Sequence, residues 1–217
     1  MHPKLTEFYQ SRLEETAKAL RKNHFAAHVT QTAADAKKLI LHTLIPEMKP
    51  ASVAFGGSMT MMETGLYEDV KALPGLKIFD TYQYSLPFEE LAEIRRQALL
   101  CDLFLLSANA VTEQGALVNL DGQGNRVAGL IYGPKKVIVL AGRNKLCPDE
   151  FAAMEHIRDM VAPVNAARLN KKTPCTATYR CQDCPSPERI CNTWTITMKS
   201  WPKERITVVL VNEDLGF

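Results

Sequence analysis

The stretch Ser52-Val53-Ala54-Phe55-Gly56-Gly57-Ser58 joins a short apolar run to two glycines and a serine. An apolar run of this length, bounded by turn residues, is typical of a strand that is buried on both faces. The same pattern recurs in Asp102–Ser107, which contains Leu-Phe-Leu-Leu, and in Lys136–Leu140. Strands covered on both faces are usual in parallel sheets, so these segments predict the centre of a parallel sheet.

Helical patterns alternate with these strands. The pattern over residues 4–24 places apolar or aromatic residues at helical spacing, at Leu13, Ala17, Leu20 and His24. A second helix is expected from Thr32, its cap, to Ile45, with Pro46 ending it. Two more helices are expected at 87–100 and 149–160, and further strands at 25–29, 76–79, 193–198 and 206–211. This alternation predicts a three-layer α/β fold, with a mainly parallel sheet and helices on both faces.

An antiparallel part is also expected. Ala116–Leu120 and Arg126–Ile131 have strand-like composition, and Asp121-Gly122-Gln123-Gly124-Asn125 between them is rich in turn residues. The sequence therefore predicts a hairpin at this point.

The composition favours a single domain over residues 1–217, since 46% of its 217 residues are hydrophobic. Its 26 basic and 24 acidic residues leave a net charge of +2, which gives no electrostatic reason to expect nucleic acid or an anionic membrane as a partner. No apolar run approaches the ~20 residues of a membrane span, and no targeting segment precedes the helix at 4–24. We expect a cytoplasmic protein.

The segment 174–192 within this domain has no hydrophobic periodicity and carries cysteines in the spacing C-x5-C-x2-C-x6-C. A long segment without regular secondary structure is uncommon in a compact domain and needs another source of order, which a bound metal would supply. Thiols stay reduced in the cytoplasm, so clustered cysteines indicate metal ligands before disulfides. The predicted metal ligands are Cys175, Cys181, Cys184 and Cys191.

An iron–sulfur cluster of the [4Fe–4S] type is the favoured centre, and zinc is the alternative. Structural zinc sites usually have two close cysteine pairs, whereas this segment has only one. Pro185 follows Cys184, as in cluster-binding motifs. If the segment binds no metal, its cysteines are free thiols, or Cys181 and Cys184 form a redox-active pair. Cys147, before Pro148, is expected to be a partly buried thiol rather than a further ligand.

A candidate binding site lies at the glycine-rich turn after the first quoted strand. The amides of Gly56 and Gly57 and the hydroxyl of Ser58, at the start of a helix, are suited to hold a phosphate or carboxylate. The competing interpretation is a tight turn in which Ser58 only caps the helix.

A second loop, Thr112-Glu113-Gln114-Gly115, follows the strand at 102–107. Ligands of open parallel sheets bind beyond the carboxyl ends of strands, so this loop and the Gly56–Ser58 turn are expected to face one crevice. Glu113 would be its acid, base or nucleophile, although a solvated loop carboxylate is the favoured interpretation of this residue taken alone. Asn125 and Arg126 would add an anion contact.

The chain resembles the LUD (lactate-utilisation) family over nearly its whole length, and within it a subgroup with a C-terminal four-cysteine motif. The resemblance is carried by four segments and the cysteine motif: Phe55–Ser58, Ala110–Asn119, Gly142-Arg143-Asn144-Lys145 and Ala162-Pro163-Val164-Asn165-Ala166. It implies a fold like that of sugar-phosphate isomerases and CoA transferases. It also implies a role in oxidising lactate to pyruvate beside iron–sulfur partner subunits.

Three functions follow as hypotheses. The first is an oxidoreductase subunit that oxidises lactate or a similar organic acid through its iron–sulfur centre. The second is a non-redox transferase or hydrolase for a phosphorylated or CoA-linked acid, with structural zinc and Glu113 as the catalytic residue. The third is a regulatory or assembly protein, in which the crevice senses a carboxylate and the metal segment docks a partner.

Overall fold

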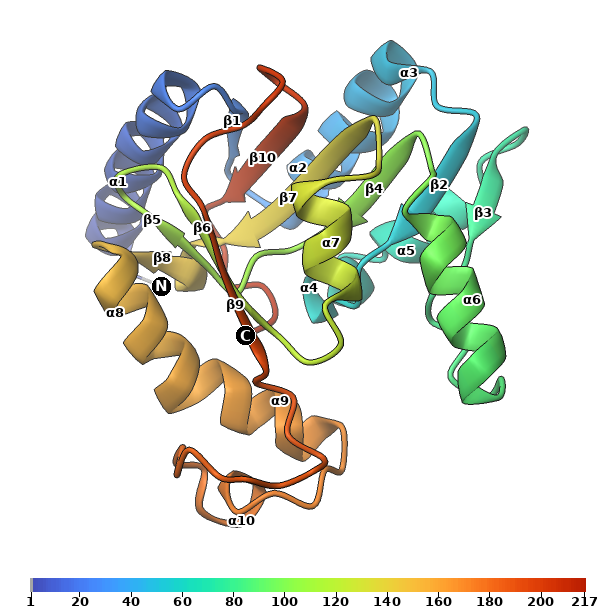
Figure 1. Ribbon diagram of the computed structural model, residues 1–217. Coiled ribbons are helices and arrows are strands. Elements are labelled where there is room, and N and C mark those ends of the chain that lie inside the picture. The colour runs from blue at the N-terminus through green and yellow to red at the C-terminus, as the bar shows by residue number, and fades with distance from the viewer. Residues whose placement is uncertain (1) are drawn as a thin grey trace.

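Six parallel strands form the central sheet of the computed structural model, which describes residues 2–217 (Figure 1). Every neighbouring pair in this sheet is parallel, which confirms the predicted sheet. The strands lie in the order β1 (Ala26–Thr30), β10 (Ile206–Val211), β7 (Lys136–Gly142), β4 (Leu103–Leu106), β2 (Ser52–Phe55) and β3 (Lys77–Phe79).

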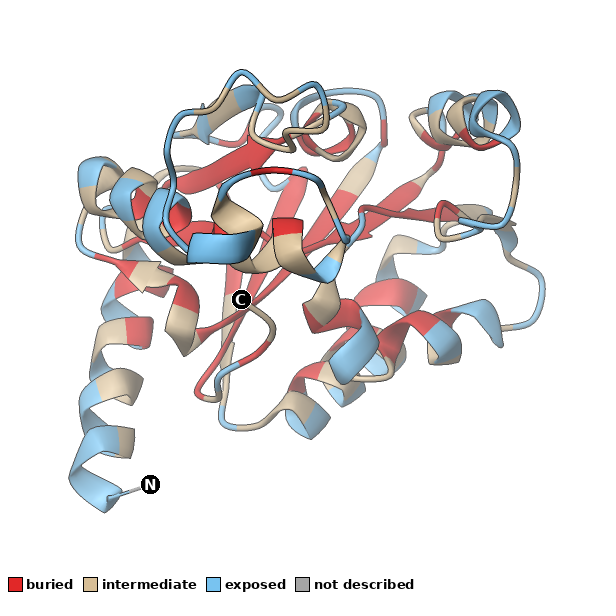
Figure 2. Cartoon of the chain, turned by 90° about the horizontal axis from the view of Figure 1, so that it is seen from below, coloured by how far each residue is buried: buried red, intermediate tan, exposed pale blue. Residues whose placement is uncertain are grey.

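Helices cover both faces of this sheet. One face packs against α1 (Pro3–Lys22), α6 (Phe88–Ala98) and α7 (Asn125–Ile131), and the other against α2 (Ala33–Leu39), α4 (Met59–Glu63) and α5 (Leu66–Lys71). In β4, Phe104 and Leu106 belong to the first core, whereas Leu103 and Leu105 belong to the second. Burial on both faces explains why the strands are apolar without alternation. Figure 2 shows the strands buried between helices whose outer sides are exposed.

A second, mixed sheet contains β8 (Leu146–Cys147), β5 (Ala110–Thr112), β6 (Leu117–Asp121) and β9 (Thr193–Thr197), in that order. Strand β6 is antiparallel to both β5 and β9, so the chain has an antiparallel part as expected. Its core is closed by α8 (Glu150–His156) and the π-helical segment η3 (Ile157–Val161).

The predicted hairpin at Asp121–Asn125 is wrong, because residues 126–131 belong to helix α7. The Asp121 carboxylate accepts hydrogen bonds from the amides of Gln123 (3.1 Å) and Gly124 (2.8 Å), which turns the chain into the helix. Val127 and Leu130, spaced as one helical face, are buried there. A short apolar run fits a strand or a helix equally well by composition alone.

Two helices extend beyond the residues at which they were expected to end. Thr32 caps α2 as predicted, with its hydroxyl accepting from the Asp35 amide at 3.1 Å. The helix then passes through a π-helical segment, η1 (Ile40–Leu44), into α3 (Ile45–Met48), so Pro46 does not end it. The helix predicted to end at Met160 likewise continues through η3 into α9 (Ala162–Arg168). Both prolines, Pro46 and Pro163, lie just after a π-helical turn, where the hydrogen-bond pattern already shifts.

The remaining elements are the 3₁₀ segment η2 (Arg143–Lys145) and the short helix α10 (Cys175–Thr178). None of the helices in residues 2–217 is long and apolar enough to cross a membrane.

Gly115 allows α1 to pack closely on the turn between β5 and β6. Its φ is +82°, and a Cβ there would lie 2.6 Å from backbone atoms of Ala19 and Leu20. We expect Gly115→Ala to lower the free energy of unfolding by about 2–4 kcal/mol, from backbone strain and the clash together. Gly75→Ala is the control, because its φ is +77° but its surroundings are open. Urea unfolding should show the smaller loss for Gly75→Ala, and equal losses would contradict the packing explanation.

Candidate functional site

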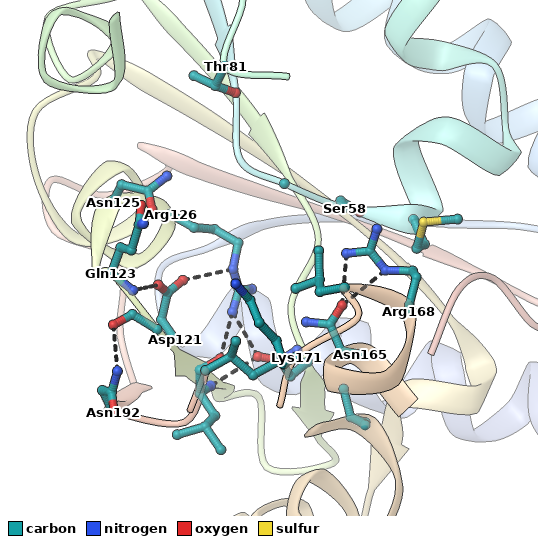
Figure 3. A pocket seen from close by; sticks show the side chains of 18 of the residues that line it. Ser58, Thr81, Asp121, Gln123, Asn125, Arg126, Asn165, Arg168, Lys171 and Asn192 are labelled. Carbon is teal, nitrogen blue, oxygen red and sulfur yellow. Dashed lines mark hydrogen bonds and ion pairs between the residues drawn. The ribbon is translucent and has the colours of Figure 1, made fainter. Parts of the chain in front are cut away.

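A pocket of about 690 Å³ lies beyond the carboxyl ends of β2 and β4. This is the edge at which open parallel sheets bind ligands, and the volume is typical of small-molecule sites. The walls come from segments far apart in the chain: residues 57–59, 107–109, 120–126, 165–171 and 187–192, with Lys145. Figure 3 shows Arg126, from one of these segments, and Arg168 and Lys171, from another, around the same space.

Arg126 organises the floor of this pocket. Its guanidinium forms an ion pair with Asp121 at 3.0 Å, and both side chains are about nine-tenths buried. The guanidinium also donates to the side chains of Asn109 and Asn119 and to the main-chain oxygens of Ser107 and Leu120. These partners occupy all five N–H groups. Arg126 therefore joins the pocket, as predicted, but it acts as an internal brace rather than as an open anion contact.

Gly56 makes room for this brace. A Cβ at Gly56 would lie 2.8 Å from Cγ of Arg126 and 3.1 Å from the ring of Phe104. The first glycine of the turn is therefore explained by close packing. Gly57 and Asn125 line the pocket itself.

The Ser58 amide and hydroxyl are already engaged within the protein. The amide donates to the Tyr82 hydroxyl at 2.7 Å, and the hydroxyl caps α4 by accepting from the Met61 amide at 3.3 Å. The structure thus favours the tight-turn interpretation over an anion cradle at Ser58, although the residue borders the pocket.

The loop Thr112–Gly115 does not face the pocket, which corrects the expectation of a shared crevice. Strand β5 carries the chain away from the sheet edge toward α1. The Glu113 carboxylate pairs there with Arg12, and Asn23 donates to the main-chain oxygens of Gln114 (2.9 Å) and Gly115 (3.0 Å). Thr112 is buried and accepts from the Ala116 amide. Glu113 therefore has no place in the chemistry of this pocket.

Basic side chains predominate in the pocket wall. Besides Arg126, it contains Arg95, Lys145, Arg168, Lys171 and Arg189, against the acidic residues Asp121 and Glu188. Asp121 is paired with Arg126, and Glu188 accepts from the Lys172 amide. Nε of both Arg95 and Arg189 is buried without a hydrogen-bond partner. Because basic side chains outnumber acidic ones and both acids are already engaged, this wall is suited to an anionic ligand.

Lys145 was not predicted as a functional residue, although it ends one of the segments that carry the family resemblance. Only 3% of it is exposed. Burial, and then the charge of Arg126, lower the pKa of its amine to about 8. Arg168 and Lys171 were also missed. The signal for Lys145 was its place just after β7, at the carboxyl edge of the sheet.

The four cysteines of the motif line one small cavity, of about 20 Å³, beside this pocket. Its other walls include Ala162, Pro163 and Ala166 of α9. Cys181 is exposed and the other three are half-buried. Among residues 2–217, no three His, Cys, Asp or Glu side chains converge as a single metal ion requires. The thiols therefore surround a common space without meeting at its centre.

Arg189 and Ile190 belong to the walls of both cavities. The Arg189 guanidinium donates to the main-chain oxygens of Cys184 (2.8 Å) and Cys191 (3.0 Å). It thereby holds the motif in place while its unpartnered Nε stays buried.

The other two cysteines lie outside this cavity. Cys101 and Cys147 are buried, and burial raises the pKa of their thiols to about 12 and about 11. Both thiols are protonated near neutral pH and pack as small apolar groups. Cys147 is thus more fully buried than the partly buried thiol that was expected there.

The fold is α/β, and a pocket lies beyond the carboxyl ends of its parallel sheet. The LUD domain profile matches residues 13–211, and the chain belongs to the LUD domain family, which is associated with lactate utilisation. A DUF162 family protein from Deinococcus radiodurans has a similar solved structure, with a TM-score of 0.54 and 12% identity over 94% of this chain and 98% of that one. At this identity the likeness shows the shared fold. No curated protein matches the sequence.

Proposed function

We propose that this protein is a redox subunit in the oxidation of lactate or a similar 2-hydroxy acid to the 2-oxo acid. The acid binds in the basic pocket, and an iron–sulfur cluster is held by Cys175, Cys181, Cys184 and Cys191. The observation that carries the proposal is the shared wall of Arg189 and Ile190 between the two cavities. A bound acid would therefore lie next to the cluster.

The cysteine segment offers the ligand set of an iron–sulfur cluster. Four thiols around one space supply the ligand set of a [4Fe–4S] cluster, in which each thiolate binds a different iron atom. The alanines and proline of α9 provide an apolar wall, and Arg189 lies close enough to offset part of the negative charge of the thiolates.

The pocket residues act by binding and orienting the acid. Arg168 and Lys171 both line the pocket, where their charges would hold a carboxylate. Oxidation of a 2-hydroxy acid releases two electrons and two protons. A cluster, when bound, supplies one-electron transfer. The electrons therefore leave singly to an iron–sulfur partner subunit, which is the acceptor in this proposal, and the protons pass to water.

A redox titration tests the coupling of pocket and cluster. An anion bound beside the cluster disfavours the added negative charge of reduction, so pyruvate should lower the midpoint potential of anaerobically purified protein, on the order of tens of millivolts. Removing a cationic partner weakens the binding of a carboxylate, and we expect Arg168→Ala to need about tenfold more pyruvate for the same shift.

Arg158→Ala is the matched control, because Arg158 is an exposed residue of the same helical run that stacks on Trp194 outside the pocket. This variant should behave like the wild-type protein. A midpoint potential that does not change when pyruvate is added would refute the coupling between the pocket and the cluster. Stoichiometric zinc with turnover of a CoA-linked acid would favour a transferase instead.

A further inference from the structure

An exposed apolar patch lies at the amino-terminal edge of the central sheet, opposite the edge that bears the pocket. Parallel strands all begin at one edge, and β4, β7 and β10 are neighbours in this sheet. The segments that directly precede these three strands each present large apolar side chains to solvent. They are Leu100 before β4, Ile131 and Tyr132 before β7, and Trp201 before β10, with exposed fractions of 80%, 50%, 84% and 82%.

The loop that carries Trp201 is held in place on both sides of this residue. The hydroxyl of Ser200, which is fully buried, donates to the main-chain oxygen of Pro202 at 3.0 Å. The Arg205 guanidinium donates to the main-chain oxygen of Leu130 at 2.7 Å, which joins the loop to the end of α7. An ordered loop therefore holds the Trp201 ring in water.

The segment after α7 is packed against the end of α6. A Cβ at Gly133 would lie 2.5 Å from the main-chain oxygen of Leu99, so Tyr132 and Leu100 come from segments that touch. Single exposed apolar residues are common on protein surfaces and need no explanation. A group of large ones on adjoining segments instead marks a surface that binds a protein or a membrane.

Lysines border this apolar patch. The segments that carry it contain four of them: Lys135, Lys136, Lys199 and Lys203. The acidic residues of the same segments are Asp102, which pairs with Lys135 at 2.6 Å, and Glu204, which lies 3.7 Å from Lys203. Lysines therefore outnumber acids here, and this edge has a local positive charge that the net charge of +2 does not reveal.

We propose that this patch binds an anionic membrane surface. The rings of Trp201 and Tyr132 combine an apolar body with a polar N–H or O–H, which suits the headgroup region of a bilayer. Lysines beside such side chains are attracted to anionic headgroups. A second copy of the chain fits less well, because a symmetric contact between two such patches would place lysines against lysines.

Binding at this edge leaves the opposite edge of the sheet open to solution. Figure 1 shows the arrows of β4, β7 and β10 pointing away from the patch and toward the lower half of the molecule, where the cysteine segment lies. A membrane-bound protein would therefore keep its pocket and its cysteines accessible to a dissolved acid and to a partner subunit. The inference does not depend on the proposed redox function.

Vesicle binding tests this proposal in the full chain. Wild-type protein should sediment with vesicles of equal parts phosphatidylglycerol and phosphatidylcholine. Vesicles of phosphatidylcholine alone should bind at least about tenfold more weakly, because each lysine near an anionic surface contributes about fivefold in affinity. The chain has two tryptophans, so Trp194→Phe leaves Trp201 as the sole reporter, and its emission should shift to shorter wavelength on binding.

Substitutions within the patch should weaken this binding. We expect a loss of at least about tenfold for Trp201→Ser, from the apolar area that no longer enters the bilayer, and of about tenfold or more for Lys203→Glu. Phe151→Ser is the matched control, because Phe151 is an aromatic residue of α8 that is 72% exposed outside this edge. This variant should bind like the wild-type protein.

Two results would overturn the membrane proposal. The first is no sedimentation with anionic vesicles, or equal losses in Trp201→Ser and Phe151→Ser. The second is an emission shift of Trp201 that grows with protein concentration in the absence of lipid, which would identify the patch as a contact between copies of the chain.

Discussion

Arg126→Ala should lower the free energy of unfolding by about 3–5 kcal/mol, the usual cost of breaking a buried ion pair. The substitution leaves the Asp121 carboxylate, only 8% exposed, without its cationic partner. It also removes donors from Asn109, Asn119 and two main-chain oxygens that lie between the second sheet and α7. The loop that forms the pocket floor is therefore the part of the fold that this substitution destabilises most directly.

Arg96→Ala is the matched control for this prediction. Arg96 also forms an ion pair, with Glu93 at 3.1 Å, but its side chain is 73% exposed. Exposed pairs contribute little, and we expect a change of at most about 0.5 kcal/mol. Chemical unfolding followed by circular dichroism measures both variants. A loss below about 1 kcal/mol for Arg126→Ala would show that the pair does not brace the fold.

Cys181→Ser should remove most of the iron from anaerobically purified protein and abolish its visible absorption. Loss of one thiolate leaves an iron atom without its protein ligand. The fold should survive, because Cys181 is exposed and belongs to none of the buried cores. Thermal unfolding of the metal-free forms of both proteins checks that point.

Cys147→Ala provides the control for metal binding. Cys147 also precedes a proline, but it packs in the core of the second sheet. Iron content per chain should stay at the wild-type value in this variant. Equal iron loss in Cys147→Ala and Cys181→Ser would mean that the motif does not define the metal site.

The central sheet could be predicted from the sequence because its signal is local. Each strand at the centre carries an uninterrupted apolar run. Such a run is typical of a strand that is buried on both faces of a parallel sheet. The common cavity of the cysteines was predictable for a related reason. The motif spans only residues 175–191, so short spacings confine the thiols to one region.

The errors at the candidate site arose where a long-range contact determines the outcome. Glu113 is turned away from the pocket by Arg12, about a hundred positions earlier in the chain. The Ser58 amide is engaged by Tyr82, and Gly115 is fixed by the close approach of α1. The lowered pKa of Lys145 likewise depends on burial and on Arg126, which no local pattern reveals. Only the assembled fold identifies these partners.

The most direct test of the central claim is the electron paramagnetic resonance spectrum of anaerobically purified, dithionite-reduced protein, recorded with its metal content. We expect about four iron atoms per chain and the signal of a reduced [4Fe–4S] cluster. One zinc per chain, or a protein free of iron and without a signal, would contradict it.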